Sequence, residues 1–451
     1  MGSLFGTDGV RGIANLDLTA ELAFKLGRAG SYILAQQNPA GRPRILVGKD
    51  TRISGDMLES ALVAGICSTG ADVLTAGIVP TPAVAYLTEK YQANCGIVIS
   101  ASHNPVEDNG IKFFGPAGYK LPDEIEERIE ELVRQGTDGL SRPQGPDVGR
   151  VYTVEAATES YLEYLLSCCG QKMNLQGMTV ILDCANGAAY HVAPALWQRL
   201  GARVISIGDK PNGININERC GSTHTGLIKR AVQHYHADLG IAYDGDADRC
   251  IAIDENGHEL DGDYIMLICA LDMHRQNLLN PPAVVATVMS NIGFEIALRR
   301  ENVRVDSCKV GDRYVLEKMV ETGALLGGEQ SGHIIFKSHA TTGDGLLTSI
   351  KLVEVMKRTG LTLSELGREM EKYPQLLVNV RIENKEAVLS HEVVQAALNE
   401  AERRLGEWGK LVVRPSGTEP LVRIMAQGSD QYLLKDVIDD IKKAVEAVAS
   451  Q

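Results

Sequence analysis

The chain alternates short apolar segments with longer amphipathic ones, and this alternation limits the possible folds more than any other feature of the sequence. Residues 44–50 (RILVGKD), 71–79 and 95–100 (CGIVIS) have the apolar, β-branched composition of buried strands. Residues 54–68 and 81–91 lie between these segments and have the apolar spacing of helices. Strands that alternate with helices predict α/β layers built on parallel sheets.

The same alternation recurs in two further stretches of the chain. The first predicts helices at 156–167 and 188–200 and strands at 179–183, 203–207, 239–243 and 250–254. The other predicts helices at 261–275, 292–300, 313–321 and 343–357 and strands at 283–289 and 303–306. Three α/β units of similar size therefore follow one another.

Around residues 367–375 the pattern changes. The order becomes strand 377–382, helix 392–405, strands 410–413 and 421–426, and helix 431–448, which predicts a small α+β domain. A Gly-, Pro- and Ser-rich stretch at 136–149 marks a boundary after the first unit, whose last helix is predicted at 122–135. The predicted fold is three α/β mixed-sheet domains (1–150, 151–255 and 256–370) and a C-terminal α+β domain (371–451) around a central cleft.

Composition excludes several classes of partner. Against 58 Asp and Glu there are 45 Lys and Arg, and the resulting net charge of −13 argues against a nucleic-acid binder. No apolar run reaches the length of a membrane span, and the N-terminus has no signal-peptide pattern. The nine cysteines lack metal-ligand spacing, and the adjacent Cys168 and Cys169 cannot easily pair. We therefore expect a cytoplasmic protein with reduced thiols.

A polar loop, SASHNP at residues 100–105, ends the predicted strand at 95–100, where α/β proteins place their ligands. We expect Ser102 to be exposed on a tight turn. His103 is its neighbour in the chain, so the ring is not expected to act as base for that hydroxyl, which disfavours acyl-transfer chemistry. The alternative is a turn whose Ser and Asn side chains bond to the backbone.

Three carboxylates occupy alternate positions in DGDADR, residues 244–249. Alternate side chains of an extended segment share a face, so Asp244, Asp246 and Asp248 are expected to lie together. Clustered carboxylates repel one another without a cation, and a ligand set made only of oxygen suits Mg²⁺. The spacing also resembles an EF-hand loop, but Arg249 stands where glycine is needed and strands flank the segment. A solvated acidic turn is the remaining alternative.

A third loop, GGEQSGH at residues 327–333, offers Glu329, Ser331 and His333 beside glycines that permit close backbone approach. This combination suits a ligand with several hydroxyl groups, although an ordinary β-turn has the same composition.

A fourth loop, RPSGTEP at residues 414–420, has the composition of a small phosphate cradle, with Arg423 close behind. A turn with a surface arginine is the alternative. Two further cations are candidates for an anion site: Arg11 in FGTDGVRG and Lys309 in KVGDR.

Taken together, the loops point to one chemistry, and each falls in a different predicted domain. They supply a hydroxyl nucleophile, a divalent-cation site, a reader of sugar hydroxyls and a separate phosphate cradle. An enzyme that transfers a phosphoryl group on a phosphosugar needs all four, provided that its cleft lies where the four domains meet.

The chain also resembles the α-D-phosphohexomutase superfamily over its whole length. The resemblance rests on FGTDGVRG, SASHNP with the following NGIK, DGDADR, GGEQSGH and RPSGTEP. FGTDGVRG together with Gln330 is typical of the glucosamine branch, whereas the phosphomannomutase/phosphoglucomutase branch typically has Met at that position. The resemblance implies conversion of glucosamine 6-phosphate to glucosamine 1-phosphate through a 1,6-bisphosphate, on the route to UDP-N-acetylglucosamine and peptidoglycan precursors.

The resemblance further implies a role for each motif residue. Ser102 would be the phosphoserine, and one Mg²⁺ per subunit would be held by Ser102, Asp244, Asp246 and Asp248. Sugar hydroxyls would be bound by Glu329 and Ser331. The phosphate that does not react would be bound, in a closing lid domain, by Arg414, Ser416, Gly417, Thr418 and Arg423. The residues expected near the reacting centre are Arg11, Lys112, Arg249, Lys309 and His333.

Other points stay open at this level. The general base is undecided among Lys112, His333 and Lys309. The resemblance implies glucosamine or glucose 1,6-bisphosphate as activator and a homodimer as the assembly. The competing hypotheses are a phosphatase that uses the same serine and metal, a non-catalytic sugar-phosphate sensor, and a phosphomannomutase or phosphoglucomutase. A phosphatase has no need of the second phosphate cradle.

Overall fold

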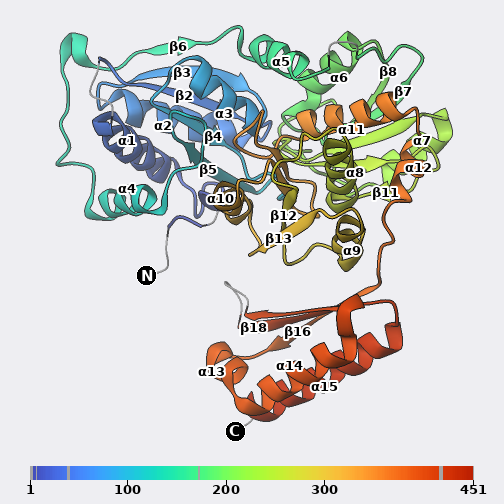
Figure 1. Ribbon diagram of the computed structural model, residues 1–451. Coiled ribbons are helices and arrows are strands. Elements are labelled where there is room, and N and C mark those ends of the chain that lie inside the picture. Colours follow the sequence, from blue (N-terminus) through green and yellow to red (C-terminus); the bar gives the residue numbers. More distant parts are fainter. Residues whose placement is uncertain (1–3, 7, 38–40, 171–172, 416–419, 450–451) are drawn as a thin grey trace.

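The computed structural model describes residues 4–6, 8–37, 41–170, 173–415 and 420–449. Four sheets are present, each with its own helices, and Figure 1 shows three of these units packed together with the C-terminal unit set apart. Three α/β domains and a C-terminal α+β domain were predicted, and this architecture is confirmed. Within the part of the chain described, no helix is long and apolar enough to cross a membrane.

The first domain contains a mixed six-stranded sheet. Its strand order is β1-β5-β4-β2-β3-β6, with antiparallel pairing on either side of β5 and parallel pairing elsewhere. The strands are β1 (Val10–Ile13), β2 (Arg44–Lys49), β3 (Asp72–Ile78), β4 (Cys95–Ile99), β5 (Asp108–Phe114) and β6 (Val151–Thr153). The helices are α1 (Ala20–Gln37), α2 (Ser54–Cys67), α3 (Thr81–Lys90) and α4 (Asp123–Gln135).

Glycines allow α1 and α2 to pack at close range. A Cβ atom on Gly27 would lie 2.4 Å from the carbonyl oxygen of Leu62, and one on Gly65 would lie 2.2 Å from that of Phe24. The helix pair buries its apolar side together with α4 in one core, which includes Leu26, Leu62 and Ile129.

The second domain contains the five-stranded sheet β11-β10-β9-β7-β8. Its strands are β7 (Thr179–Asp183), β8 (Arg203–Ile207), β9 (Leu239–Tyr243), β10 (Cys250–Ile253) and β11 (Glu259–Leu260). Its helices are α5 (Ala157–Ser167), α6 (Ala189–Arg199) and α7 (Gly226–Tyr235). Strands β9 and β10 form an antiparallel hairpin, so the acidic loop between them lies at one end of the sheet.

The third domain contains the four-stranded sheet β13-β12-β14-β15. Its strands are β12 (Ala283–Thr287), β13 (Arg304–Cys308), β14 (Leu326–Gly328) and β15 (Ile334–Phe336). Its helices are α8 (Gly262–Arg275), α9 (Ile292–Arg300), α10 (Asp312–Thr322), α11 (Gly345–Thr359) and α12 (Leu363–Gly367). One apolar core continues from α3 of the first domain into the second and third domains, through Val84, Trp197 and Phe294 among others.

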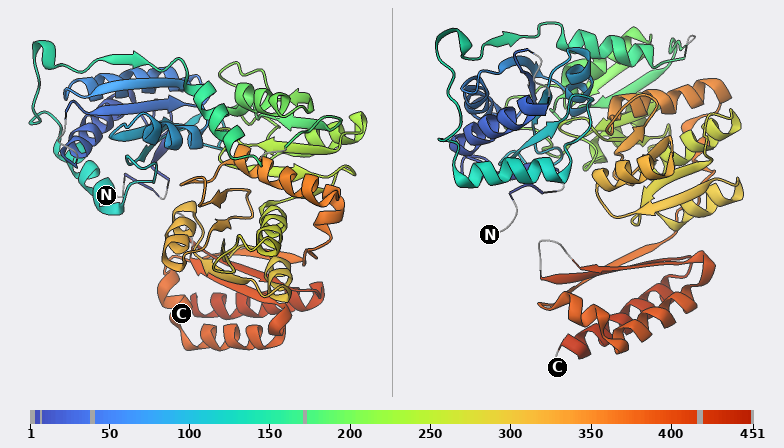
Figure 2. Two further views of the ribbon diagram at one scale, coloured as in Figure 1. Left: turned by 45° about the horizontal axis from the view of Figure 1, so that its top comes forward. Right: turned by 60° about the vertical axis from the view of Figure 1, so that its left-hand side comes forward.

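The C-terminal domain is an antiparallel three-stranded sheet, β16-β18-β17, covered by helices and with a core of its own. Its elements are β16 (Gln375–Arg381), α13 (Lys385–Ser390), α14 (Glu392–Leu405), β17 (Lys410–Pro415), β18 (Leu421–Gln427) and α15 (Gln431–Ala449). Figure 2 shows that the chain enters this domain by a single extended segment after α12.

Candidate active site

Ser102 lies in the loop between β4 and β5, where its backbone has φ of 53°, in the left-handed region. Its hydroxyl donates a hydrogen bond to Asp244 Oδ2 at 2.6 Å. The expectation that Ser102 is exposed is wrong, because 1 % of its surface is accessible. The acidic loop of the second domain covers it: a Cβ atom on Gly245 would lie 2.4 Å from the carbonyl oxygen of Ser102.

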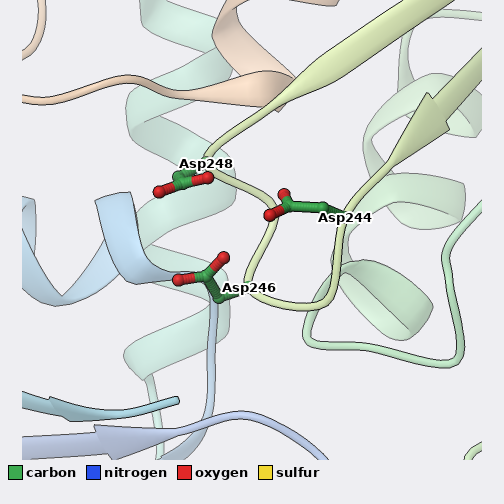
Figure 3. A group of neighbouring side chains, drawn as sticks. All are labelled: Asp244, Asp246 and Asp248. Carbon is green, nitrogen blue, oxygen red and sulfur yellow. The ribbon is translucent and has the colours of Figure 1, made fainter. Parts of the chain in front are cut away.

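The three aspartates of that loop point toward one another (Figure 3), and an oxygen atom from each lies within 4.8 Å of the other two. Asp244 Oδ1 accepts a hydrogen bond from the amide of Arg249 at 3.1 Å. Asp246 Oδ2 accepts one from Thr81 Oγ1 at 2.7 Å. The loop is thus anchored by its own backbone and by the first turn of α3. As predicted, strands flank it, which is unlike the two helices of an EF-hand.

This group of aspartates has the chemistry of a divalent-cation site. Asp246 Oδ1 and Asp248 Oδ1 are buried without a hydrogen-bond partner, so each has a free acceptor. Burial raises the pKa of Asp244, and the neighbouring Asp248 and Asp246 raise it further. Ionised carboxylates in such a place need a cation, and Mg²⁺ prefers oxygen ligands of this kind. The residues present therefore fit the metal that the sequence predicted.

Lys112 contacts the group from β5 of the first domain. Its Nζ lies 3.0 Å from Asp246 Oδ2 and 3.0 Å from Asp8 Oδ2, and Asp8 also pairs with Arg11. Burial by itself would lower the pKa of Lys112, but Asp246 and Asp8 outweigh it and raise the pKa above its ordinary value. The ammonium form is therefore favoured, and Lys112 is suited to a cationic role.

Charges from the third domain complete the surroundings of the aspartates. His333, between β14 and β15, has its Nδ1 3.4 Å from Asp248 Oδ2 and its Nε2 3.8 Å from Asp312 Oδ2. The amide of Gly343 donates to Nε2 at 3.0 Å, which places the ring proton of a neutral His333 on Nδ1, facing Asp248. Lys120 of the first domain pairs with Asp312, so negative and positive groups alternate from Asp248 through His333 and Asp312 to Lys120.

Arg249 follows the aspartates and has its Nε 3.7 Å from Asp248 Oδ1. Burial would lower its pKa, but Asp248, Asp244 and Glu329 together raise it, so the guanidinium stays charged. Because Glu329 is one of the charges that act on Arg249, the third loop lies close to the group of aspartates.

The ring of His103 lies next to the hydroxyl of Ser102. Its Nδ1 is 3.3 Å from Ser102 Oγ, whereas adjacency in the chain argued against the ring as base for that hydroxyl. The left-handed backbone at Ser102 turns the two neighbouring side chains toward each other. Burial, with the charges of Arg249 and Arg11, lowers the pKa of His103 to about 4. A neutral ring therefore stands beside the hydroxyl at neutral pH.

In the third loop, Glu329 Oε1 accepts a hydrogen bond from the amide of Gly311 at 3.0 Å. Ser331 Oγ is buried without a hydrogen-bond partner, so it is available to a ligand. Lys309 is exposed, and its ammonium lies 5.9 Å from the centroid of the Tyr314 ring. Of the three candidate bases, Lys112 and His333 contact the aspartates, whereas the contact described for Lys309 is this ring.

The fourth loop is described only in part. Arg414 and Arg423 are direct partners across β17 and β18. Burial lowers the pKa of Arg414, and the charge of Arg423 lowers it further. Opposed like charges favour an anion between them. The predicted residues Ser416, Gly417 and Thr418 lie outside the described residues. Figure 1 shows β18 in the C-terminal unit, set apart from the other three domains.

Besides His103, four residues around the aspartates were not predicted from the sequence as site residues: Asp8, Thr81, Lys120 and Asp312. Thr81 and Lys120 lie in segments without any distinctive motif, so their roles follow only from the packing of the domains. Asp8 lies in the motif FGTDGVRG and Asp312 in KVGDR, where the predictions concerned only the cations Arg11 and Lys309. An acidic residue three positions from a predicted cation was the sequence feature that could have indicated these carboxylates.

Comparisons with known proteins agree with this geometry. Models for the alpha/beta/alpha domains I, II and III and the C-terminal domain of phosphoglucomutase/phosphomannomutase match residues 2–139, 159–257, 261–373 and 377–444. The phosphoglucosamine mutase of Syntrophomonas wolfei subsp. wolfei is 72% identical over 99% of both chains.

Two solved structures share the fold. A phosphoglucomutase/phosphomannomutase family protein from Burkholderia thailandensis superposes with a TM-score of 0.81 at 23% identity, over 99% of this chain and 98% of its own. The N-acetylphosphoglucosamine mutase of Aspergillus fumigatus, in complex with GlcNAc-6P and magnesium, gives a TM-score of 0.71 at 17% identity, over 99% of this chain and 96% of its own. With four family models matched in order and a relative of such high identity, the chain belongs to the phosphoglucomutase/phosphomannomutase family of the α-D-phosphohexomutase superfamily.

Proposed function

We propose that this chain interconverts glucosamine 6-phosphate and glucosamine 1-phosphate through a phosphorylated Ser102 and a 1,6-bisphosphate intermediate. The observation that carries the proposal is the 2.6 Å hydrogen bond from the Ser102 hydroxyl to Asp244, inside a group of three buried aspartates. A 72% identical relative named phosphoglucosamine mutase supports the choice of the amino sugar. The product would feed the synthesis of UDP-N-acetylglucosamine and peptidoglycan precursors.

In this proposal Asp244, Asp246 and Asp248, with an oxygen of the group on Ser102, hold one Mg²⁺ ion. When bound, the ion neutralises charge on the phosphoryl oxygens and so lowers the barrier to transfer of the phosphoryl group. The Aspergillus fumigatus enzyme forms its complex with magnesium, which supports this choice of metal.

The reaction needs two transfers at one place. The bond between phosphorus and Ser102 Oγ breaks while a bond forms from phosphorus to the free hydroxyl of the substrate, and the proton of that hydroxyl passes to a base. The bisphosphate then turns end for end, and its other phosphoryl group returns to Ser102. Lys112 and Arg249 stabilise charge on the transferring group because both are cationic and adjacent to the aspartates.

Other residues would hold the sugar while it turns. Glu329 and Ser331 would bind hydroxyl groups, since both belong to the third loop, Glu329 offers carboxylate acceptors and Ser331 Oγ has no hydrogen-bond partner. The phosphate that is not reacting would lie against Arg414 and Arg423, and Ser416, Gly417 and Thr418, which follow Arg414 in the sequence, would add donors. Arg11 and His333 would lie near the reacting phosphate, and Lys309 would reach it only after a movement.

The setting of the reaction is part of the same proposal. Glucosamine or glucose 1,6-bisphosphate would act as activator by restoring the phosphate on Ser102, and the C-terminal domain would close as a lid that excludes water. A homodimer in the cytoplasm is proposed as the working form. All nine cysteines are free thiols, which fits a reducing compartment.

Coupled turnover tests the proposed function. Glucosamine 6-phosphate, glucose 1-phosphate and mannose 1-phosphate are supplied separately with Mg²⁺ and a trace of glucose 1,6-bisphosphate, and free phosphate is measured in parallel. We expect the highest kcat/KM with glucosamine 6-phosphate and no net release of phosphate. A higher kcat/KM on mannose or glucose phosphate would contradict glucosamine 6-phosphate as the preferred substrate. Accumulation of free phosphate would contradict the mutase reaction.

A further inference from the structure

The carbonyl groups on either side of His103 are each held by the same two side chains. Arg52 Nη2 donates to the carbonyl oxygen of Ser102 at 3.0 Å and to that of Asn104 at 2.8 Å. Asn217 Nδ2 donates to the same two oxygens, at 2.9 Å and 3.0 Å. Neither residue belongs to the motifs on which the proposed function rests.

Arg52 reaches the loop from the end of β2 in the first domain. Its guanidinium also bonds to the carbonyl of Pro105 and pairs with Asp50, and both side chains of this ion pair are 1 % exposed or less. Asp50 Oδ2 in turn accepts the hydroxyl of Ser100, whose oxygen accepts the amide of Ser102 at 3.0 Å. Arg52 is therefore part of a buried network that fixes both the amide and the carbonyl of Ser102.

Asn217 reaches the same carbonyls from the second domain, from the connection between β8 and α7. It is 8% exposed and its φ of 57° is left-handed, a conformation that Asn tolerates better than most residues. The acidic loop passes directly over it: a Cβ atom on Gly245 would lie 2.9 Å from Asn217 Nδ2. The amide of Asn217 thus lies between the nucleophile loop of one domain and the aspartate loop of the other.

We propose that Asn217 and Arg52 are positioning residues that hold Ser102 in its left-handed conformation, with its hydroxyl aimed at the aspartates. A left-handed non-glycine residue persists only where its surroundings over-determine it, and the donors on the carbonyls of Ser102 and Asn104 do so here. The same donors satisfy the negative ends of these carbonyls, which lie beside the aspartate loop. The inference rests on the proposed function for its catalytic consequence.

The test replaces Asn217 by Asp, which keeps the size and tolerates the backbone but turns the donor into an acceptor facing two carbonyl oxygens. Asn217→Gly removes the amide without strain at the left-handed position. Asn215→Asp is the matched control, because Asn215 lies two residues away and its amide bonds to Lys210 O instead. For each variant, kcat and KM are measured separately, with the unfolding midpoint and the amide exchange of the segment 100–106.

Both Asn217 variants are expected to lose about a hundredfold in kcat, as small misplacements of a reacting group do, with KM changed far less. Amide exchange in 100–106 should accelerate about tenfold, and Asn215→Asp should match the wild type. Arg52→Lys, which keeps the charge but not the planar fork, should show the same division between kcat and KM.

Wild-type kcat in both Asn217 variants would overturn the inference, whatever the exchange data show. A loss of kcat with unaltered exchange in 100–106 would also overturn it, since Asn217 would then act by another route. If the wild type itself turned over no sugar phosphate, the proposed function would fail. Faster exchange in Asn217→Asp than in Asn215→Asp would then still support the positioning contact.

Discussion

Ser102 combines a left-handed backbone, burial and a hydrogen bond to a buried carboxylate of another domain. A left-handed non-glycine residue costs about 1–3 kcal/mol, which the rest of the structure must offset. Such strain is typical of residues that must present a group in one direction. At the scale of single residues, the site therefore depends on the direction of the Ser102 hydroxyl, which points at Asp244.

Ser102→Ala is expected to abolish mutase turnover and to leave the fold intact. The change removes one hydrogen bond, worth about 1 kcal/mol, so the unfolding midpoint should fall by only a few degrees. Intact-mass analysis should show a phosphate adduct on part of the wild-type protein and none on the variant. Full activity in the variant would rule out the covalent mechanism.

Asp246→Asn tests the metal ligands. Without Mg²⁺ the sequence suggests that removal of one of three like charges would stabilise the protein, but the structure argues for the reverse. Asp246 Oδ2 pairs with the buried Lys112, so the variant should lose about 1–3 kcal/mol of stability. Its kcat should fall far more than this loss of stability explains, with weaker dependence on Mg²⁺.

The control for Asp246→Asn is Asp254→Asn, a buried carboxylate at the far end of β10 that binds the amides of Asn256 and His258. Activity and Mg²⁺ dependence should be unchanged in this variant. Activity that survives a chelator in wild type and Asp246→Asn alike would refute the metal site.

Among the secondary-structure elements, most of the alternation of strands and helices could be predicted from the sequence, but the close packing between helices could not. Helix α14 has the predicted bounds, and α2 ends one residue before its predicted end. No element was predicted before Arg44, yet α1 spans 18 residues there. Its Gly27 and Gly30 lower helix propensity, but they are needed because Leu62 and Phe113 approach their α-carbons closely.

The candidate site was predictable as a set of loops but not as a set of contacts. Motif spacing identified Ser102 and the three aspartates because each follows or precedes a strand. The burial of Ser102 could not be predicted, since it results from a loop of another domain that packs on it. For the same reason no sequence pattern indicated Thr81, whose hydroxyl joins α3 to Asp246.

Gly245→Ala tests the contact between the two loops. The new methyl group would lie 2.4 Å from the carbonyl oxygen of Ser102, a backbone atom that cannot move away easily. We expect the loops to separate, with a loss of at least about a hundredfold in kcat. Gly226→Ala is the control in the same domain, because the nearest atom to its Cβ is a flexible arginine nitrogen at 3.7 Å. Equal kcat in the two variants would show that the loops need not touch.

At the scale of the whole molecule, the domains are joined in two different ways. The first three share one continuous apolar core, and Lys120 links the first and third through Asp8 and Asp312. The C-terminal domain has its own core, and polar contacts tie it to the start of α9: Lys410 to Glu295 at 2.5 Å and Gln427 to the amide of Ile292 at 2.7 Å. A small polar interface permits rotation of one domain against another, as the proposed lid requires.

Arg414→Ala tests whether this domain takes part in the reaction. The phosphate that Arg414 would bind is the one that does not react, so its binding energy serves to position the sugar and to close the lid. A hydrogen bond to a charged group is worth about 1.5–3 kcal/mol, so kcat/KM should fall about ten- to a hundredfold, with KM raised and kcat lowered. Arg403→Ala, an exposed arginine on α14 paired with Glu400, is the control within the same domain.

The decisive readout for Arg414→Ala is its response to added bisphosphate. A loosely closed lid lets the 1,6-bisphosphate escape before its second phosphoryl group returns to Ser102, so the enzyme is left without phosphate and stops. Added glucose 1,6-bisphosphate should restore the phosphate on Ser102 and rescue much of the lost rate, while Arg403→Ala should need no such addition. A phosphatase would show no rescue, because its cycle does not regenerate a phosphoserine from bisphosphate. If Arg414→Ala left kcat, KM and bisphosphate dependence unchanged, the loop after β17 would be an ordinary turn, and the C-terminal domain would have no role in holding the substrate.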